Sequence, residues 1–113
     1  MPFPEIRPRR LRASPFLRRL VSENTLPVQK LVMPIFVTFG QNKVEPISSM
    51  PGINRLSVDK LEKEIDVIRS LKIPAVILFG IPETKDSEAS GAWVTEGVVQ
   101  RAISTIKKQA PDL

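Results

Sequence analysis

The chain has 113 residues with a formal net charge of +5, and it contains neither Cys nor His. The length predicts one small domain, and the missing residue types exclude disulfides, thiolate zinc sites, Cys nucleophiles and an imidazole base from it. No apolar run approaches the roughly 18 residues of a membrane span, and arginines interrupt any secretory signal, so a cytoplasmic protein without a membrane partner is the default expectation.

The positive charge is concentrated at the N-terminus. Residues 1–30 carry seven Arg or Lys against two Glu, whereas residues 31–113 carry ten of each sign. The Pro- and Arg-rich residues 1–13 predict an extended arm, and Ser14 followed by Pro15 predicts the start of a short helix. Such an arm can be a solvated tail, can bind nucleic-acid phosphates, or can pack on another subunit. We favour the last, because Arg suits bidentate interface contacts with carboxylates.

Two apolar runs predict strands. Residues 31–37 are apolar throughout, and residues 75–80 are uncharged and rich in β-branched side chains. Runs of this kind are typical of parallel strands buried on both faces. Pro34 indicates either a bulge or a strand whose pairing begins late. Residues 38–56 are predicted to be mostly loop, with a small hairpin over residues 39–44.

Two helices are predicted from apolar residues that recur every three or four positions. The first is expected to start at a Ser57 cap and to end before Pro74. The second is expected to start at a Thr95 cap and to end before Pro111. The inward residues are predicted to be Val58, Leu61, Ile65, Ile68 and Leu71 in the first helix, and Val98, Val99, Ala102, Ile103, Ile106 and Ala110 in the second.

The order strand, helix, strand, helix predicts a parallel βαβ unit followed by a helix. Two parallel strands leave both sheet edges open, and the sequence stops where a third strand is due. We therefore expect an α/β fold built as the beginning of a larger protein. It consists of a basic N-terminal arm with a short helix, residues 1–30, followed by the first two βα units of a TIM (β/α)8 barrel, residues 31–113.

Few residues are candidates for chemistry. Phe79 lies at the carboxyl end of the second predicted strand, where α/β folds place ligands, so it either lines a pocket or belongs to the core. Glu83, Asp86 and Glu88 lack the spacing of a calcium loop, and a solvated polar loop is the preferred interpretation. No lysine lies in an apolar strand, the environment that would lower its pKa for Schiff-base chemistry.

Taken in order, several segments resemble the N-terminal part of the porphobilinogen synthase (5-aminolevulinate dehydratase) family. They are residues 7–12, 14–15, 31–37, 45–52, 55–57, 73–80, 99–103 and 111–113. The resemblance implies a TIM-barrel lyase of tetrapyrrole (haem) biosynthesis that condenses two 5-aminolevulinate molecules to porphobilinogen, usually as a homo-octamer. It also implies two catalytic lysines on later strands, one of which forms a Schiff base, and zinc or magnesium held beyond this chain.

No catalytic or metal-binding residue is therefore assigned within the chain, which is expected to be an N-terminal fragment that is inactive alone. The resemblance places Phe79 at the barrel mouth, near substrate. It assigns the contacts with a neighbouring subunit to Arg9, Arg10 and Arg12. Where relatives often have Gly-Ser, this chain has Ala89-Ser90. The alternative hypothesis is a small basic module that binds nucleic acid or an acidic partner.

Overall fold

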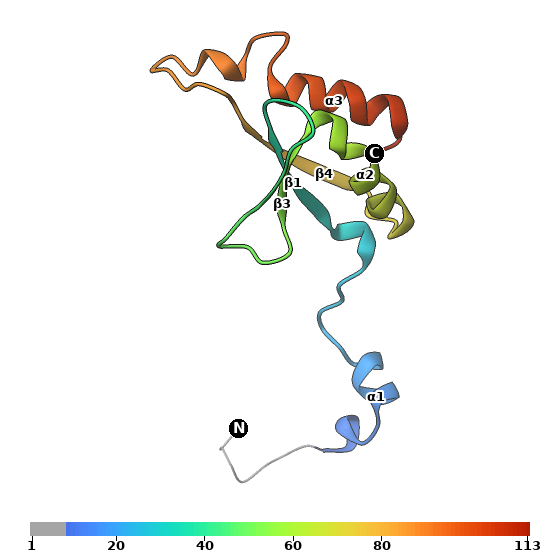
Figure 1. The fold of residues 1–113 in the computed structure, drawn as a ribbon. Coiled ribbons are helices and arrows are strands. Elements are labelled where there is room, and N and C mark those ends of the chain that lie inside the picture. The colour runs from blue at the N-terminus through green and yellow to red at the C-terminus, as the bar shows by residue number, and fades with distance from the viewer. Residues whose placement is uncertain (1–8) are drawn as a thin grey trace.

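The computed structural model describes residues 9–113. Two helices cover one face of a small sheet, and the N-terminal segment stands away from this body (Figure 1). The molecule is accordingly elongated, with principal-axis extents of 63 × 32 × 24 Å. Residues 1–8, the first part of the predicted extended arm, lie outside the described residues.

The N-terminal segment contains one short α-helix between two single 3-10 turns. The first turn, η1, spans Arg10–Arg12, so this part of the predicted arm is not extended. Helix α1 spans Pro15–Leu20, and the second turn, η2, spans Val28–Lys30. The predicted cap is confirmed, because the Ser14 hydroxyl oxygen accepts the Leu17 N–H at 3.2 Å. None of the residues in these three elements is buried.

Four strands form one mixed sheet in the order β2-β3-β1-β4. Strand β1 is Val32–Thr38 and strand β4 is Ala75–Ile81, and the two pair in parallel over all seven residues. The predicted parallel pair is therefore confirmed. Strand β3, Asn54–Ser57, pairs in parallel with β1, and strand β2, Val44–Pro46, pairs antiparallel with β3.

The hairpin formed by β2 and β3 differs from the predicted one. Residues 39–43 connect β1 to β2 and do not form a hairpin of their own. On the side of β3, the pairing of β1 begins at Phe36, which lies after Pro34. This late start agrees with the second of the two explanations for the proline, because no ladder on that side reaches Pro34.

The two predicted helices exist, but each begins later than its expected cap. Helix α2 spans Leu61–Ser70 and follows the 3-10 turn η3, Val58–Lys60. The Ser57 hydroxyl accepts the Lys43 N–H at 2.9 Å and donates to the Lys43 carbonyl at 3.3 Å. Ser57 therefore ties the turn before β2 to the end of β3 instead of capping a helix.

Helix α3 spans Val98–Gln109, and its N-cap is Gly97 without a side-chain hydrogen bond, so the predicted Thr95 cap is wrong. The predicted end before Pro111 is confirmed. Gln109 Nε2 donates to the Glu62 carbonyl at 3.0 Å and to Asp66 Oδ1 at 2.8 Å, which joins the end of α3 to α2.

The core lies between the sheet and these two helices. Its buried members are Ile35, Val37, Leu56, Leu61, Ile65, Ile68, Ala102, Ile106 and Ala110. The predicted inward faces are therefore correct at their centres, but Leu71 and Ile103 are exposed. The prediction that both strands are buried on both faces is wrong for β4, where Ile77 and Phe79 are 48% and 46% exposed. No element among residues 9–113 covers this second face of the sheet, which we call the open face.

Candidate functional site

Phe36 and Phe79 form an aromatic pair on the open face. Side chains alternate along a strand, and Ile35 and Val37 are buried against the helices, so Phe36 between them points to the other face. The parallel register places Phe36 beside Phe79. Their rings are stacked, with centroids 5.3 Å apart and an interplanar angle of 21°. The predicted pocket residue Phe79 thus lies half exposed near the carboxyl end of β4.

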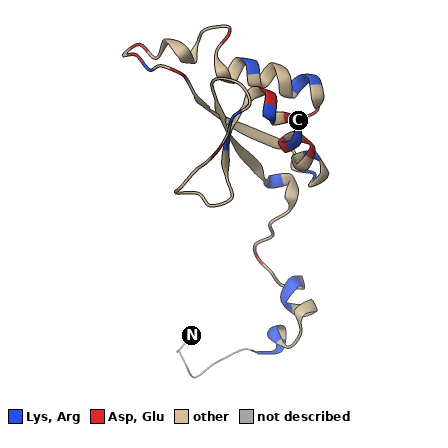
Figure 2. Cartoon of the chain, viewed as in Figure 1, with Lys and Arg blue, Asp and Glu red and all other residues tan. Residues whose placement is uncertain are grey.

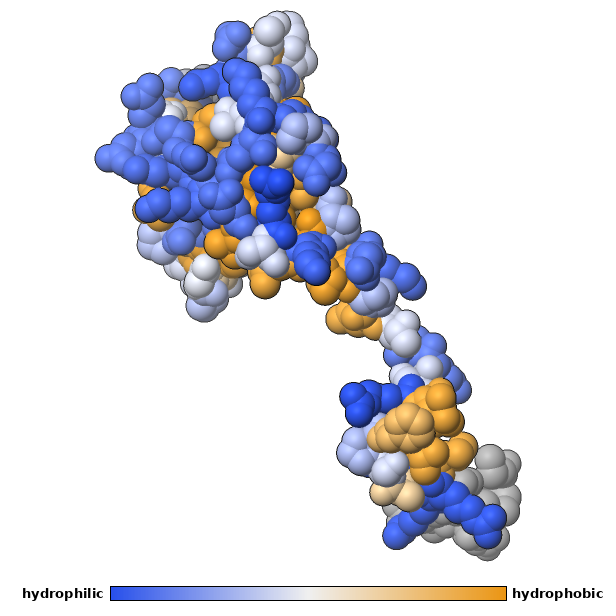
Figure 3. All heavy atoms as spheres, turned by 90° about the vertical axis from the view of Figure 1, so that its right-hand side faces the viewer, coloured by the Kyte–Doolittle hydropathy of each residue, from blue (hydrophilic) through white to orange (hydrophobic). Residues whose placement is uncertain are grey.

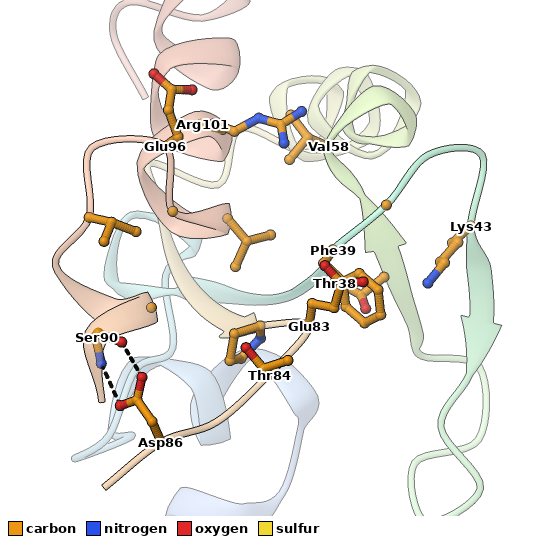
Figure 4. Close-up of a pocket in the computed structure, with 16 residues that line it drawn as sticks. Thr38, Phe39, Lys43, Val58, Glu83, Thr84, Asp86, Ser90, Glu96 and Arg101 are labelled. Atoms are coloured by element: carbon orange, nitrogen blue, oxygen red, sulfur yellow. Dashed lines mark hydrogen bonds between the residues drawn. The ribbon is translucent and has the colours of Figure 1, made fainter. Parts of the chain in front are cut away.

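A cavity of about 630 Å³ lies at the carboxyl ends of β1 and β4 (Figure 4). Its walls come from the end of β1, the β1–β2 connection, the loop after β4 and the first turn of α3. Its charged lining consists of Lys43 and Arg101 together with Glu83, Asp86 and Glu96. The Lys43 ammonium lies over the Phe39 ring, 3.8 Å from its centroid. Phe79 is not part of this lining, so the structure separates the predicted pocket residue from the cavity.

Asp86 organises the loop between β4 and α3. Its carboxylate accepts the Ser90 N–H at 2.9 Å, the Glu88 N–H at 3.1 Å and the Ser90 hydroxyl. The Ser90 hydroxyl, aided by these backbone N–H groups, holds the pKa of Asp86 below its ordinary value, although desolvation opposes the shift. The Asp86 carboxylate therefore serves to hold the loop together through these hydrogen bonds. No group of three or more His, Cys, Asp or Glu that could hold a metal lies within residues 9–113.

Asp59 holds the connection between β1 and β2, next to the cavity residues Lys43 and Val58, and the sequence analysis did not single it out. Both of its carboxylate oxygens accept the Asn42 N–H, at 3.1 and 3.0 Å. The neighbouring Ser57 hydroxyl and this N–H hold the pKa of Asp59 below its ordinary value. Asn42 has a left-handed backbone with φ of 54°. The carboxylate therefore fastens a strained connection between β1 and β2 to the turn η3.

The N-terminal segment that carries the arm residues stands away from the sheet and its two helices (Figure 1). Arg9, Arg10 and Arg12 are exposed at η1, and the Arg18 guanidinium donates to the Arg12 carbonyl at 3.1 Å. Lysines and arginines recur along the arm in Figure 2, and apolar surface gathers beside them in Figure 3. Phe16 on α1 is 65% exposed. Among the described residues, no helix is long and apolar enough to cross a membrane.

The chain has parallel strands joined by a helix and a cavity at the carboxyl ends of these strands. This arrangement defines an α/β protein, a class in which ligands bind at this edge of the sheet. The family model described as delta-aminolevulinic acid dehydratase matches residues 5–113, and the chain belongs to this family. The resemblance found in the sequence is confirmed.

Several relatives agree with this assignment. The chain is 53% identical over 111 residues to the delta-aminolevulinic acid dehydratase of Synechocystis sp., covering 98% of this chain and 34% of the relative. It is 45% identical over 107 residues to the enzyme of Halalkalibacterium halodurans, covering 95% of this chain and 33% of the relative. The chain thus spans about one third of the length of these curated relatives.

A solved structure has the same fold as this chain. It is the crystal structure of delta-aminolevulinic acid dehydratase (porphobilinogen synthase) from Toxoplasma gondii, in complex with the reaction product porphobilinogen. The superposition has a TM-score of 0.86 at 37% sequence identity, and it covers 96% of this chain and 31% of that chain. The mixed α/β fold of this chain therefore matches about one third of that dehydratase chain.

Proposed function

We propose that the chain forms the N-terminal third of a porphobilinogen synthase, which condenses two 5-aminolevulinate molecules to porphobilinogen with loss of water in tetrapyrrole biosynthesis. The observation that carries this proposal is the family match over residues 5–113. The likeness to the product-bound Toxoplasma gondii structure supports it. In this proposal residues 31–113 supply the first two βα units of a TIM barrel. The open face of the sheet then lines the barrel interior, because barrel helices lie outside.

Phe79 is the substrate-pocket residue of the proposal, since it lies on the open face at the end of the strands where barrel enzymes carry their sites. The chain fits no zinc centre with Cys or His ligands, because it has neither residue, and residues 9–113 hold no group of three or more carboxylates placed to bind a metal. We therefore assign the family's zinc or magnesium and its catalytic lysines to other parts of the cytoplasmic enzyme. The 113-residue chain alone is then inactive.

The N-terminal segment is proposed to pack on a neighbouring subunit, as the homo-oligomeric family suggests. Its elements bury none of their own residues, and Phe16 and Leu20 are 65% and 68% exposed beside Arg9, Arg10 and Arg12. An apolar stripe next to unburied guanidinium groups is suited to a protein surface that offers both apolar contacts and carboxylates. This supports an arm between subunits.

A chimera tests the proposed activity. The matching first third of the Synechocystis relative is replaced by this chain, which is 53% identical to it. We expect the chimera to form porphobilinogen from 5-aminolevulinate at a rate comparable to that of the parent enzyme, and the purified 113-residue chain to form none. A folded chimera without turnover, or turnover by the chain alone, contradicts the proposal.

The same chimera tests the arm. Replacing Arg9, Arg10 and Arg12 by Glu should shift the chimera to smaller assemblies in light scattering, because the reversed charges repel the carboxylates of the neighbouring subunit. The matched control reverses three charges on the body, at Lys63, Lys72 and Lys108, and should leave the assembly unchanged. Equal assembly of the arm variant and the control rules out the arm contact. If the arm variant instead loses binding to nucleic acid while its assembly is unchanged, the basic-module alternative is supported.

A further inference from the structure

We propose that Phe36 is a positioning residue that holds the ring of Phe79 in place for substrate. This inference rests on the proposed function, in which Phe79 lies at the substrate pocket. It concerns a residue to which neither the sequence motifs nor the family resemblance assigned a role.

The two rings have the geometry of a favourable aromatic pair. Their centroids are 5.3 Å apart at an interplanar angle of 21°. Stacked aromatic pairs at such separations are more stable than their buried area alone accounts for. The register of β1 and β4 brings the two backbones side by side, so the pairing follows from the fold.

The stack joins two neighbouring strands. Phe36 lies on β1 and pairs with Arg55 of β3 on one side and with Phe79 of β4 on the other. Among residues 9–113, Phe36 is the aromatic residue stacked against the ring of Phe79, which is 46% exposed. The Phe36 ring is therefore the described contact that can restrain Phe79.

The neighbouring positions on the open face provide no other aromatic ring that could stack against Phe79. One step before the pair, Pro34 lies beside Ile77, and one step after it, Thr38 lies beside Ile81. Neither pair offers a second aromatic surface against which the Phe79 ring could stack. Without the Phe36 ring, Phe79 would gain rotational freedom, and binding substrate would have to restrict it again.

The test uses the active chimera and separates substrate binding from turnover. Phe36→Ala should raise the KM for 5-aminolevulinate by about threefold to tenfold, the range expected for loss of one aromatic pair, and should leave kcat within about twofold. Phe36→Tyr keeps the stack and should restore the KM. Phe36→Ala combined with Phe79→Ala should be no worse than Phe79→Ala alone, because Phe36 acts through Phe79.

Leu78→Ala is the matched control, since Leu78 lies next to Phe79 but packs against the helix-covered core. This variant should lose stability without raising the KM. An unchanged KM in folded Phe36→Ala, or an equal rise in Leu78→Ala, overturns the inference.

A second measurement does not depend on activity. With 4-fluorophenylalanine at position 79 of the folded chimera, Phe36→Ala should move the fluorine resonance toward that of a freely rotating ring. A fluorine resonance that does not shift in Phe36→Ala overturns the positioning role itself. An inactive chimera combined with a responsive resonance refutes the proposed function, and with it the link to substrate, while the ring contact stands.

Discussion

Ala89 occupies a backbone conformation that favours glycine, with φ of 52° and ψ of 38°. A non-glycine residue in this conformation destabilises the folded state by roughly 1–2 kcal/mol. Glycine would relieve this strain, but its greater freedom in the unfolded chain would offset roughly 0.4–1 kcal/mol of the gain in stability. We expect Ala89→Gly to raise the free energy of unfolding by about 0.5–1 kcal/mol, measured by urea denaturation. Ala92→Gly, three residues on, should lower it, and equal effects of the two variants would refute the explanation by strain.

Asp86 should make the order of its loop depend on pH. The pKa of Asp86 is lowered in the folded chain, chiefly by the Ser90 hydroxyl. The Asp86 carboxylate therefore stabilises the folded loop at any pH above the ordinary carboxyl pKa. This stabilisation is lost as the pH falls through the lower pKa of the folded chain. The fluorescence of Trp93, the only tryptophan and part of the same loop, should therefore change below about pH 4. Asp86→Asn should abolish this transition, whereas Glu88→Gln should retain it.

At the scale of elements, Gly80 sets how closely helix α3 approaches strand β4. A Cβ added at Gly80 would lie 2.5 Å from Val99 Cγ2 and 2.9 Å from Val98 Cγ1, closer than real contacts allow. Gly80→Ala should therefore displace the first turn of α3 and lower the free energy of unfolding by about 1–3 kcal/mol, measured by urea denaturation.

The matched variant is Gly80→Ala with Val99→Ala, which removes the closest clashing methyl group. This double variant should recover part of the loss when compared with Val99→Ala alone. If Gly80→Ala costs the same in both backgrounds, the close approach of α3 is not the cause.

The centres of the elements and the helix ends set by Pro74 and Pro111 were predictable from the sequence, whereas the starts of α2 and α3 were not. The buried stripe through Leu61, Ile65 and Ile68 follows directly from helical spacing. The Ser57 hydroxyl could either cap a helix or bond to a distant backbone group. In the structure it bonds to the backbone of Lys43, 14 residues away, which the local sequence does not reveal. Strands β2 and β3 escaped prediction because three or four residues are too few to show a period.

The candidate site was predictable only in part, for a related reason. The position of Phe79 at the end of an apolar run is visible in the sequence, and so is the departure from glycine at Ala89. The partner of Phe79 depends on the register between β1 and β4, and a shift by one residue would turn Phe36 to the other face. The contact of Asp59 with the Asn42 N–H likewise joins segments 17 residues apart.

At the scale of the whole molecule, the two edges of the sheet differ. Strand β2 at one edge is short and contains Pro46 and Glu45, features that discourage pairing with another chain. Strand β4 at the other edge is seven residues long and carries no charge or proline. Within residues 9–113, the sheet therefore has an unprotected edge at β4, next to an apolar face.

We expect the purified 113-residue chain to self-associate through this edge, because unpaired backbone groups beside exposed Ile77 and Phe79 favour pairing with a second copy. Ile77→Lys should weaken the association by at least about tenfold in sedimentation equilibrium, since pairing would bury the new charge. Val67→Lys places the same charge on the exposed surface of α2 and should leave the association unchanged. A chain that stays monomeric at about 100 μM, or that responds equally to both lysines, would show that the edge of β4 does not drive assembly.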